Sequence, residues 1–420
     1  MRVEGSLRVP GDKSISHRAL MLAALADGRS RVTGILDSAD VHSTAEVLRA
    51  LGADVPLLSR DIAIEGVGLR GLRAAATSLD CGNSGTTTRL MAGIVAARPF
   101  SSTFTGDESL SRRPMRRIAR PLEAMGARVE LPPHGGLPMT IRGGALKDLS
   151  WTSEVASAQV KSAILLAGVV AGVRVVIEEP ARTRDHTERM LRARAVDVAA
   201  NGTRVELAPG HGGIAPLDTD VPGDPSSAAF IAALAALADG GSLTLADVCV
   251  NETRTGFFDT LRRMGAHVEF ERDRLTGGEW VSSIVIRPQD LRGVCVGGDV
   301  VPSMIDELPL LACVAARAEG ETVITGAAEL RVKESDRIAA VVDNLRAIGV
   351  EAEELPDGMR VVGGHAPLRG LVKSFSDHRL AMAFGVLGSL PGNDVRVDNP
   401  ECVAVSYPGF WADLQRVRRA

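Results

Sequence analysis

Six times along this chain, a short polar segment is followed at once by an apolar stretch of helix length. The polar segments lie near residues 13, 83, 158, 225, 304 and 377. Between them recurs an amphipathic helix that ends in glycine and a small apolar residue and is followed by a strand, as at 47–55, 122–129, 261–268 and 345–350. Sequence repeats of this kind indicate repeated structural units, so the 420 residues divide into six α/β units of about 70 residues each.

The repeats also divide the chain at its midpoint. Residues 9–12 read Val-Pro-Gly-Asp, and residues 221–224 read the same. Three units lie before the second copy and three after it, which favours two closed, pseudo-threefold domains over a solenoid. We predict an α/β (α+β) fold with a first domain of residues 12–222 and a second of residues 1–11 and 223–420. The local pattern of the strand before Pro10 fits either domain, and we place it with residues 1–11 in the second.

The polar segments suggest where ligands bind. Unpaired backbone N–H groups and peptide dipoles give a helix N-terminus partial positive charge. Ligand pockets are frequent at domain interfaces. We therefore expect the site in the cleft between the two domains, and closure of that cleft on binding.

The composition limits the classes of partner. A net charge of −4 gives no general attraction to a polyanion, and 3% aromatic residues argue against base-stacking platforms. We therefore expect no nucleic acid partner and only local anion sites. The absence of an apolar signal core or a long uncharged apolar run indicates no membrane association. Five scattered cysteines without a CxxC pair fit a cytoplasmic protein with reduced thiols, at 81, 249, 295, 313 and 402.

Lysine is rare, since only five of the 48 basic residues are lysines. A lysine in such a chain is more often present for its own chemistry, as a compact ammonium. Lys13 and Lys333 fall in the two most unusual motifs. Lys147, Lys161 and Lys373 fit plain surface positions equally well.

The first of these motifs is Pro10-Gly-Asp-Lys-Ser-Ile-Ser-His-Arg18. Lys13, Ser14 and Arg18 at the start of an apolar helix suit a phosphate or carboxylate. A P-loop needs glycine directly before its lysine, and Asp12 stands there, so a nucleotide is disfavoured. A helix cap with incidental charges is the alternative.

Four further segments are weaker indications of a ligand-binding site. Residues 66–71 match GxGxxG but fit a turn, and residues 81–89 fit anion binding and helix capping equally. In the arginine run 112–120, mostly a solvated face, Arg113 before Pro114 at an expected helix start is the best ligand candidate. Residues 183–188 suggest a helix N-terminus with a capping box, in which His186 is structural. No histidine pair has metal-ligand spacing, so we expect no metal.

The second motif, Arg331-Val-Lys-Glu-Ser-Asp-Arg337, has the densest charge. Ser335 is expected to cap the helix that follows. Alternating charge on a capped helix is often mere surface. A rare lysine beside a carboxylate, however, suits proton transfer next to a bound anion.

Taken together and in order, these segments resemble the 5-enolpyruvylshikimate-3-phosphate (EPSP) synthase family over nearly the whole chain. Each motif alone is weak, but the ordered set is specific. The resemblance implies two domains, each of three βαβαββ units, arranged as an inside-out α/β barrel. It rests on residues 10–18, 82–86, 112–114, 157–159, Asp306, 331–337 and 377–379.

The resemblance also implies an activity. Family members transfer the enolpyruvyl group of phosphoenolpyruvate to the 5-hydroxyl of shikimate 3-phosphate and release phosphate, in the shikimate pathway to chorismate and the aromatic amino acids. No cofactor is implied, and we expect a monomer and inhibition by glyphosate. The implied ligands of shikimate 3-phosphate are Lys13, Ser14, Arg18, Ser157, Ala158, Gln159, Arg184, Asp306 and Lys333. Those of phosphoenolpyruvate are Lys13, Asn83, Gly85, Arg113, Gln159, Arg337 and Arg379.

The reaction needs a base for the 5-hydroxyl and an acid for the methylene carbon. We assign Asp306 as the base and Glu334 as the acid, with helix capping as the alternative role of Asp306. Lys13 is expected to stabilise the phosphate and to share in proton transfer. The intermediate is tetrahedral and not bound covalently to the protein, so no nucleophile is required.

One position departs from the family. A further phosphoenolpyruvate-binding lysine often stands near the C-terminus, where this chain has Val405. The departure bears on phosphoenolpyruvate affinity more than on the reaction.

Two rival functions stay open. The related UDP-N-acetylglucosamine enolpyruvyl transferases usually carry a reactive cysteine in a loop of the first domain, and residues 107–120 contain none. A non-catalytic RNA-binding protein using the arginine run is the rival of another class.

Overall fold

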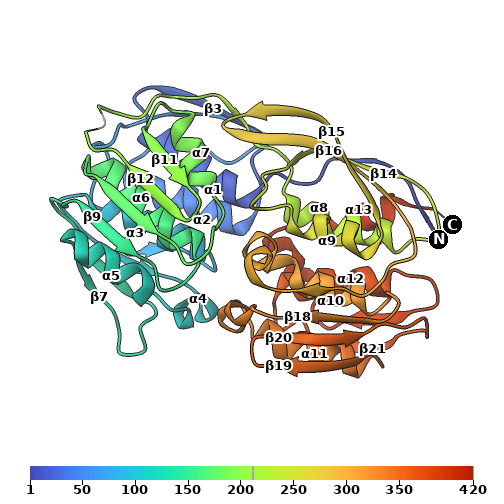
Figure 1. Cartoon of the computed structure of the whole chain (residues 1–420). Coiled ribbons are helices and arrows are strands. Elements are labelled where there is room, and N and C mark those ends of the chain that lie inside the picture. The colour runs from blue at the N-terminus through green and yellow to red at the C-terminus, as the bar shows by residue number, and fades with distance from the viewer. Residues whose placement is uncertain (211, 420) are drawn as a thin grey trace. The chain divides into compact units, whose positions relative to one another are not determined.

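The structure is a computed structural model that describes residues 1–210 and 212–419. Contacts divide the chain into two compact units (Figure 1). The N-terminal unit comprises Gly11–Val221 and Leu275–Glu279, and the C-terminal unit comprises Met1–Pro10, Pro222–Arg274 and Trp280–Ala420. The short segment 275–279, which lies in the turn of a β-hairpin, therefore belongs by its contacts to the N-terminal unit.

The N-terminal unit contains three α/β repeats. Its helices are α1 (Lys13–Leu25), α2 (Ala39–Ala50), α3 (Gly85–Ala96), α4 (Glu108–Arg112), α5 (Arg116–Met125), α6 (Ala158–Ala171) and α7 (His186–Arg192). Its strands are β3 (Arg29–Thr33), β4 (Asp61–Glu65), β5 (Leu79–Asp80), β6 (Ser101–Thr105), β7 (Arg128–Glu130), β8 (Met139–Arg142), β9 (Leu149–Thr152), β10 (Val175–Glu178), β11 (Val198–Asn201), β12 (Arg204–Leu207) and β13 (Thr219–Asp220).

The C-terminal unit follows the same plan. Its α-helices are α8 (Pro225–Ala236), α9 (Gly256–Met264), α10 (Leu308–Ala315), α11 (Arg337–Ala347), α12 (His378–Gly388) and α13 (Phe410–Arg416). Its 3₁₀ helices are η1 (Gly298–Ser303), η2 (Ile305–Glu307), η3 (Ala328–Val332) and η4 (Pro400–Val405). Its strands are β1 (Arg2–Val3), β2 (Gly5–Leu7), β14 (Leu243–Cys249), β15 (His267–Thr276), β16 (Glu279–Arg287), β17 (Cys295–Val296), β18 (Glu321–Ile324), β19 (Glu351–Leu355), β20 (Gly358–Val362), β21 (Arg369–Val372), β22 (Asp394–Val397) and β23 (Arg418–Arg419).

The strand pairing is that of βαβαββ repeats. Two sheets of the N-terminal unit have the orders β5-β6-β8-β7 and β11-β12-β10-β9. In each, the first two strands of the repeat pair in parallel across a helix, and the last two form an antiparallel pair. The sheet β17-β18-β20-β19 repeats this order in the C-terminal unit. The predicted fold class is thereby confirmed.

Two repeats take a strand from a distant part of the chain. Strand β13, at the end of the N-terminal unit's main segment, pairs in parallel with β3. Strand β2 at the start of the chain pairs in parallel with β14, and β1 pairs antiparallel with β23 at the other end of the chain. The strand before Pro10, whose local pattern fits either domain, therefore lies in the β15-β16-β14-β2 sheet.

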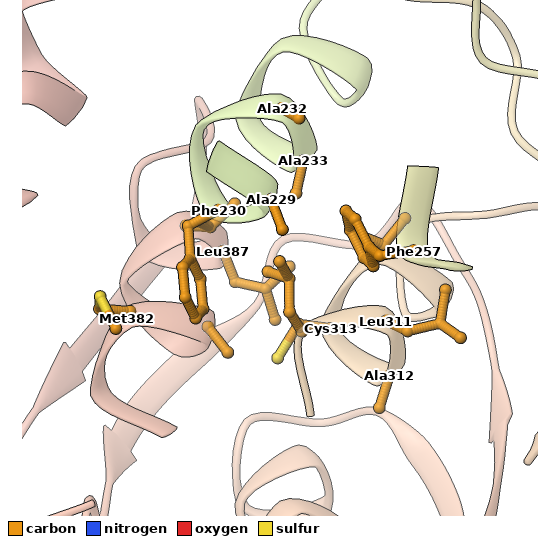
Figure 2. Close-up of a cluster of buried hydrophobic side chains, with 14 of the residues drawn as sticks. Ala229, Phe230, Ala232, Ala233, Phe257, Leu311, Ala312, Cys313, Met382 and Leu387 are labelled. Carbon is orange, nitrogen blue, oxygen red and sulfur yellow. The ribbon is translucent and has the colours of Figure 1, made fainter. Parts of the chain in front are cut away.

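The apolar helices form the interior of each unit. All twelve residues of α8 are buried, as are most residues of α1, α3, α6, α10 and α12. A helix that is apolar on every side must be covered on every side. Figure 2 shows side chains of α8, α10 and α12 meeting in the C-terminal unit, among them Phe230, Leu311 and Leu387.

Among the residues described, every helix is too short or too polar to span a lipid bilayer. The amphipathic helices lie between the central ones along the chain. Two of them, α5 and α9, end at glycines in the left-handed conformation, Gly126 (φ 115°) and Gly265 (φ 113°). That conformation strains a residue with a Cβ, which explains the recurring glycine in the sequence pattern.

The close approach of α3 and α6 gives a stability prediction. A Cβ added to Gly93 in α3 would lie 2.1 Å from the carbonyl oxygen of Ala163 in α6. Helix propensity favours alanine over glycine by about 1 kcal/mol, but this clash is with backbone. We expect Gly93→Ala to lower the free energy of unfolding by about 1–3 kcal/mol, measured by urea denaturation.

Gly144→Ala is the control, because nothing lies within 4 Å of its added Cβ. It should leave the urea midpoint unchanged. A Gly93→Ala midpoint equal to or above that of the wild type would contradict the close helix contact.

Candidate active site

Five of the six central helices begin with a side-chain cap. In each, the carboxylate or hydroxyl of the N-cap residue accepts a hydrogen bond from a backbone N–H of the first turn. The caps are Asp12, Ser84, Ser157, Asp224 and Asp377. Helix α10 differs, because its N-cap residue is Glu307 and Asp306 lies in η2 just before it. Asp306 is therefore not the cap of α10.

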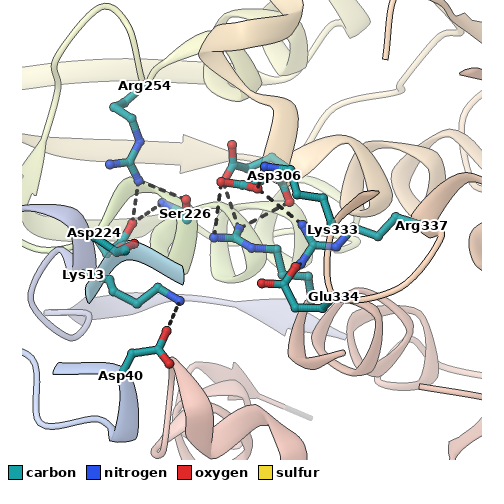
Figure 3. Close-up of polar contacts among 12 residues, drawn as sticks. Lys13, Asp40, Asp224, Ser226, Arg254, Asp306, Lys333, Glu334 and Arg337 are labelled. Atoms are coloured by element: carbon teal, nitrogen blue, oxygen red, sulfur yellow. Dashed lines mark hydrogen bonds and ion pairs between the residues drawn. The ribbon is translucent and has the colours of Figure 1, made fainter. Parts of the chain in front are cut away.

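Asp306 is surrounded by cations within the C-terminal unit (Figure 3). Its Oδ1 lies 3.4 Å from Lys333 Nζ and 3.3 Å from an Arg337 nitrogen, and its Oδ2 lies 3.9 Å from Arg379. The Asp306 side chain is 14% exposed. Three cationic side chains of this unit therefore lie around one partly exposed carboxylate.

Arg337 connects this cluster to the buried interior of the C-terminal unit. Its side chain is 1% exposed, and its Nε and one terminal nitrogen donate to Asp377 at 2.8 and 3.1 Å. The same terminal nitrogen donates to Glu334 at 2.6 Å. Burial alone would lower the pKa of Arg337, but Asp377 and Glu334 outweigh it and raise the pKa. Arg337 is charged, and its partners are carboxylates.

Asp377 is the fully buried carboxylate partner of Arg337. Burial would raise the pKa of this carboxyl, but the Arg337 guanidinium lowers it below its usual value. The Ser335 hydroxyl also donates to Asp377 at 3.0 Å. The expectation that Ser335 caps the following helix is wrong, because the Asp336 carboxylate accepts from the N–H groups of Ile338 and Ala339 instead.

Arg379 is held at the start of α12. One terminal nitrogen donates to the Glu307 carboxylate at 3.1 Å and to the Asp306 carbonyl oxygen at 3.3 Å. The arginine therefore links the starts of α10 and α12. The structure brings together five of the predicted site residues in this unit, namely Asp306, Lys333, Glu334, Arg337 and Arg379.

In the N-terminal unit, the start of α1 carries three predicted residues. Lys13 Nζ donates to Asp40 at 3.1 Å. Arg18 reaches across to α6 and α7, where it donates to Ser162 at 2.8 Å and to Thr187 at 2.7 Å. It also donates to the Ser14 carbonyl oxygen at 2.9 Å, so two predicted ligands, Ser14 and Arg18, lie in contact.

The start of α3 brings three more together. A terminal nitrogen of Arg113 donates to the Asn83 side-chain oxygen at 2.6 Å, and the Asn83 amide donates to Asp107. An added Cβ on Gly85 would lie 3.5 Å from Arg113 and 3.0 Å from Arg89. Two guanidinium groups therefore converge on Gly85. Arg113 itself follows the short helix α4 and precedes α5, not directly at a helix start as expected.

The start of α6 carries Ser157, Ala158 and Gln159. The Ser157 hydroxyl caps the helix, which agrees with the polar-head pattern. The Gln159 side chain is held at both ends, because its oxygen accepts from Arg89 at 2.5 Å and its nitrogen donates to Thr86 at 3.0 Å. The amide orientation is thereby fixed relative to α3.

Two expectations at α7 and α6 need correction. Helix α7 begins at His186, and its N-cap residue, Asp185, makes no side-chain capping bond, so the capping box is absent. Arg184 lies two residues before the start of α7, and its positive charge contributes to lowering the pKa of Arg18. Lys161 is not a surface residue, since it is 2% exposed and lies 2.7 Å from Glu179 and 2.9 Å from Glu188.

Several polar residues that hold the site were not singled out from the sequence. They are Asp40, Arg89, Ser162, Thr187 and Glu307. Four of them lie in or directly before helices that the sequence had marked, and Asp40 is the acidic residue of the first turn of α2. Residue type alone did not distinguish them, because each depends on contact with another repeat.

The arrangement suits the binding of small anions next to a carboxylate pair that can exchange protons. Cationic groups lie at helix N-termini in both units, and Asp306 and Glu334 share Arg337 as a partner. Within residues 1–210 and 212–419, no group of three or more His, Cys, Asp or Glu side chains is arranged to hold a metal ion.

Comparison with known proteins agrees with this geometry. The family model described as EPSP synthase (3-phosphoshikimate 1-carboxyvinyltransferase) matches residues 1–414. A 3-phosphoshikimate 1-carboxyvinyltransferase of Sulfurihydrogenibium sp. is 48% identical over 100% of this chain and 98% of its own. One from Alkalilimnicola ehrlichii is 49% identical over 97% of this chain and 92% of its own.

Solved structures give the same family. An EPSP synthase structure from Acinetobacter baumannii superposes with a TM-score of 0.87 at 42% identity, over 99% of this chain and 96% of that one. The enolpyruvyl transferase NikO from Streptomyces tendae has a TM-score of 0.79 at 20% identity, over 99% and 95%, and so shares the fold. From these matches and the site they accompany, the chain belongs to the EPSP synthase (3-phosphoshikimate 1-carboxyvinyltransferase) family.

Proposed function

We propose that this chain transfers the enolpyruvyl group of phosphoenolpyruvate to the 5-hydroxyl of shikimate 3-phosphate and releases phosphate. Family membership over the whole chain supports the reaction. The observation that carries the proposal is the Asp306 carboxylate among Lys333, Arg337 and Arg379, with Glu334 bound to the same Arg337. In this proposal, Asp306 of the cluster is the base, Glu334 is the acid, and the cations bind the anionic substrates.

In the addition step, Asp306 takes the proton of the 5-hydroxyl, and the oxygen bonds to C2 of phosphoenolpyruvate. Glu334 gives a proton to the methylene carbon C3, which forms a tetrahedral intermediate. In the elimination step, C3 returns a proton to Glu334, the double bond between C2 and C3 forms again, and the bond from C2 to the phosphate oxygen breaks. Phosphate leaves with the proton that Asp306 took from the 5-hydroxyl. Lys13 stabilises the charge on that phosphate and shares in proton transfer.

The proposed ligands follow the family pattern. Shikimate 3-phosphate is bound by Lys13, Ser14, Arg18, Ser157, Ala158, Gln159, Arg184, Asp306 and Lys333. Phosphoenolpyruvate is bound by Lys13, Asn83, Gly85, Arg113, Gln159, Arg337 and Arg379. Arginine suits both ligands, because its planar fork pairs with two oxygens of a carboxylate or phosphate. From the family resemblance and the net charge of −4, we further infer a monomer that works in the cytoplasm without nucleic acid or membrane partners.

Phosphate release tests the reaction. We expect the protein to release phosphate when it is mixed with phosphoenolpyruvate and shikimate 3-phosphate together, and not with either alone. Well-folded protein that releases none would contradict the proposal. Release with UDP-N-acetylglucosamine as acceptor would favour the related transferase, and salt-dependent RNA binding without any release would favour a nucleic-acid-binding protein.

Glu334→Gln tests the acid. The amide keeps an oxygen that can accept from Arg337, at the position where Glu334 now accepts at 2.6 Å, but it has no carboxyl proton to give. We expect kcat to fall by about 10²-fold or more, while binding of both substrates by calorimetry stays close to that of the wild type. Glu353→Gln, on exposed strand β19 of the same unit, is the control. Near-normal turnover of Glu334→Gln would remove Glu334 from this role.

Gly85→Ala tests whether phosphoenolpyruvate binds next to Gly85. The added methyl would press on the end of Arg89 at 3.0 Å and would come into ordinary van der Waals contact with the end of Arg113 at 3.5 Å. These side-chain ends can shift without unfolding the protein, so the KM of phosphoenolpyruvate should rise by about tenfold, which corresponds to about 1.4 kcal/mol. The KM of shikimate 3-phosphate should change less. Gly364→Ala, with open space around its added Cβ, should change neither constant.

A further inference from the structure

Arg18 is buried, and within the described part of the chain its guanidinium donates hydrogen bonds only to neutral oxygens. Its side chain is 4% exposed. Nε donates to the Thr187 hydroxyl at 2.7 Å, one terminal nitrogen to the Ser14 carbonyl at 2.9 Å, and the other to the Ser162 hydroxyl at 2.8 Å. Burial lowers the pKa of Arg18 to about 10, against the opposing effect of more distant carboxylates, of which Glu188 has the largest effect.

Arg337 shows how different this arrangement is. It is equally buried, but three carboxylates bind it directly, and they raise its pKa. Its charge is therefore compensated within the protein. Among residues 1–210 and 212–419, no carboxylate lies at hydrogen-bond distance from the Arg18 guanidinium. A buried cation whose partners are all neutral is stabilised by a bound anion, because the anion supplies the opposite charge that the protein does not.

The neutral partners also fix the direction of the Arg18 fork. A guanidinium has five N–H donors. Three are used by Thr187, Ser14 and Ser162, which leaves one on each terminal nitrogen. That pair is the one that grips two oxygens of a carboxylate or phosphate.

The two hydroxyls are themselves held in place. The Thr187 hydroxyl donates to Ser162 at 2.7 Å, which joins α7 to α6. The residue before Thr187, His186, lies 2.7 Å from the buried Glu279 carboxylate. Lys161, the residue before Ser162, lies 2.9 Å from Glu188, the residue after Thr187. Thr187 therefore lies beside a residue held by a buried hydrogen-bonded contact, and Ser162 beside a residue held by a buried ion pair.

We propose that Thr187, together with Ser162, is a positioning residue that aims the Arg18 guanidinium at shikimate 3-phosphate. This inference rests on the proposed function, because it takes that substrate as the anion. Thr187 acts through Arg18 and does not touch the substrate itself. Its hydroxyl should therefore affect the binding of shikimate 3-phosphate, and should have little effect on the binding of phosphoenolpyruvate or on kcat.

Thr187→Val tests this role, because valine has the same shape and lacks the hydroxyl. We expect the KM of shikimate 3-phosphate, and its dissociation constant measured by calorimetry without phosphoenolpyruvate, to rise about tenfold or more. The KM of phosphoenolpyruvate and kcat should stay within about threefold of the wild-type values. Thr187→Ser, which keeps the hydroxyl, should restore most of the shikimate 3-phosphate affinity.

Thr260→Val is the matched control. Thr260 is a buried threonine of the C-terminal unit whose hydroxyl contacts the sulfur of Met304. It should cost some stability in urea denaturation and leave both KM values unchanged. A general loss of structure in Thr187→Val would instead raise both KM values and lower kcat together.

The failures are distinguishable. An active wild type whose Thr187→Val variant binds shikimate 3-phosphate normally, or in which Thr187→Ser does not restore affinity, would overturn the positioning role alone. A folded wild type that neither binds shikimate 3-phosphate nor releases phosphate would overturn the proposed function, and this role with it.

Discussion

A helix that is buried on every side can meet a ligand only at its ends. This constraint determines where ligand-binding groups can stand on the six central helices. Helix α8 is buried along its whole length, and the other five central helices are buried along most of theirs. Their sides are used for packing, so polar chemistry is confined to their first turns, where unpaired N–H groups already favour negative charge. For this reason many of the proposed anion ligands lie in the polar segments that begin these helices, while Arg113, Arg184, Lys333 and Arg337 lie outside those segments.

The two units use buried arginine in opposite ways. In the C-terminal unit, Arg337 is surrounded by Asp306, Glu334 and Asp377, so it organises carboxylates whose positions matter for proton transfer. In the N-terminal unit, Arg18 is surrounded by hydroxyl and carbonyl oxygens, which orient its charge without neutralising it. Sequence motifs containing Arg, Ser and Asp look alike in both cases. The difference arises from which residues the fold brings to each guanidinium.

The division between what the sequence predicted and what it did not is physical. The repeats, the central helices and the fold class follow from periodic hydrophobicity and local turn chemistry, and these were confirmed. Ser335 as a helix cap was wrong, because two polar residues stand side by side and only backbone geometry selects Asp336. Lys161 was assigned no role, because its partners Glu179 and Glu188 lie on other elements. Long-range pairing of this kind is not visible in a local pattern, whereas the order of motifs along the chain identified the family.

The pairing of β1 with β23 has a consequence for the time course of biosynthesis. Arg2 lies opposite Arg419, and β2 lies beside β14, so the C-terminal unit is assembled from segments that are far apart in the sequence. The N-terminal unit, apart from residues 275–279, is fully translated once residue 221 has been added. A ribosome therefore produces nearly all of one unit while the first strands of the other wait for partners. The pair that β1 forms with β23 must wait until residues 418 and 419 have been translated.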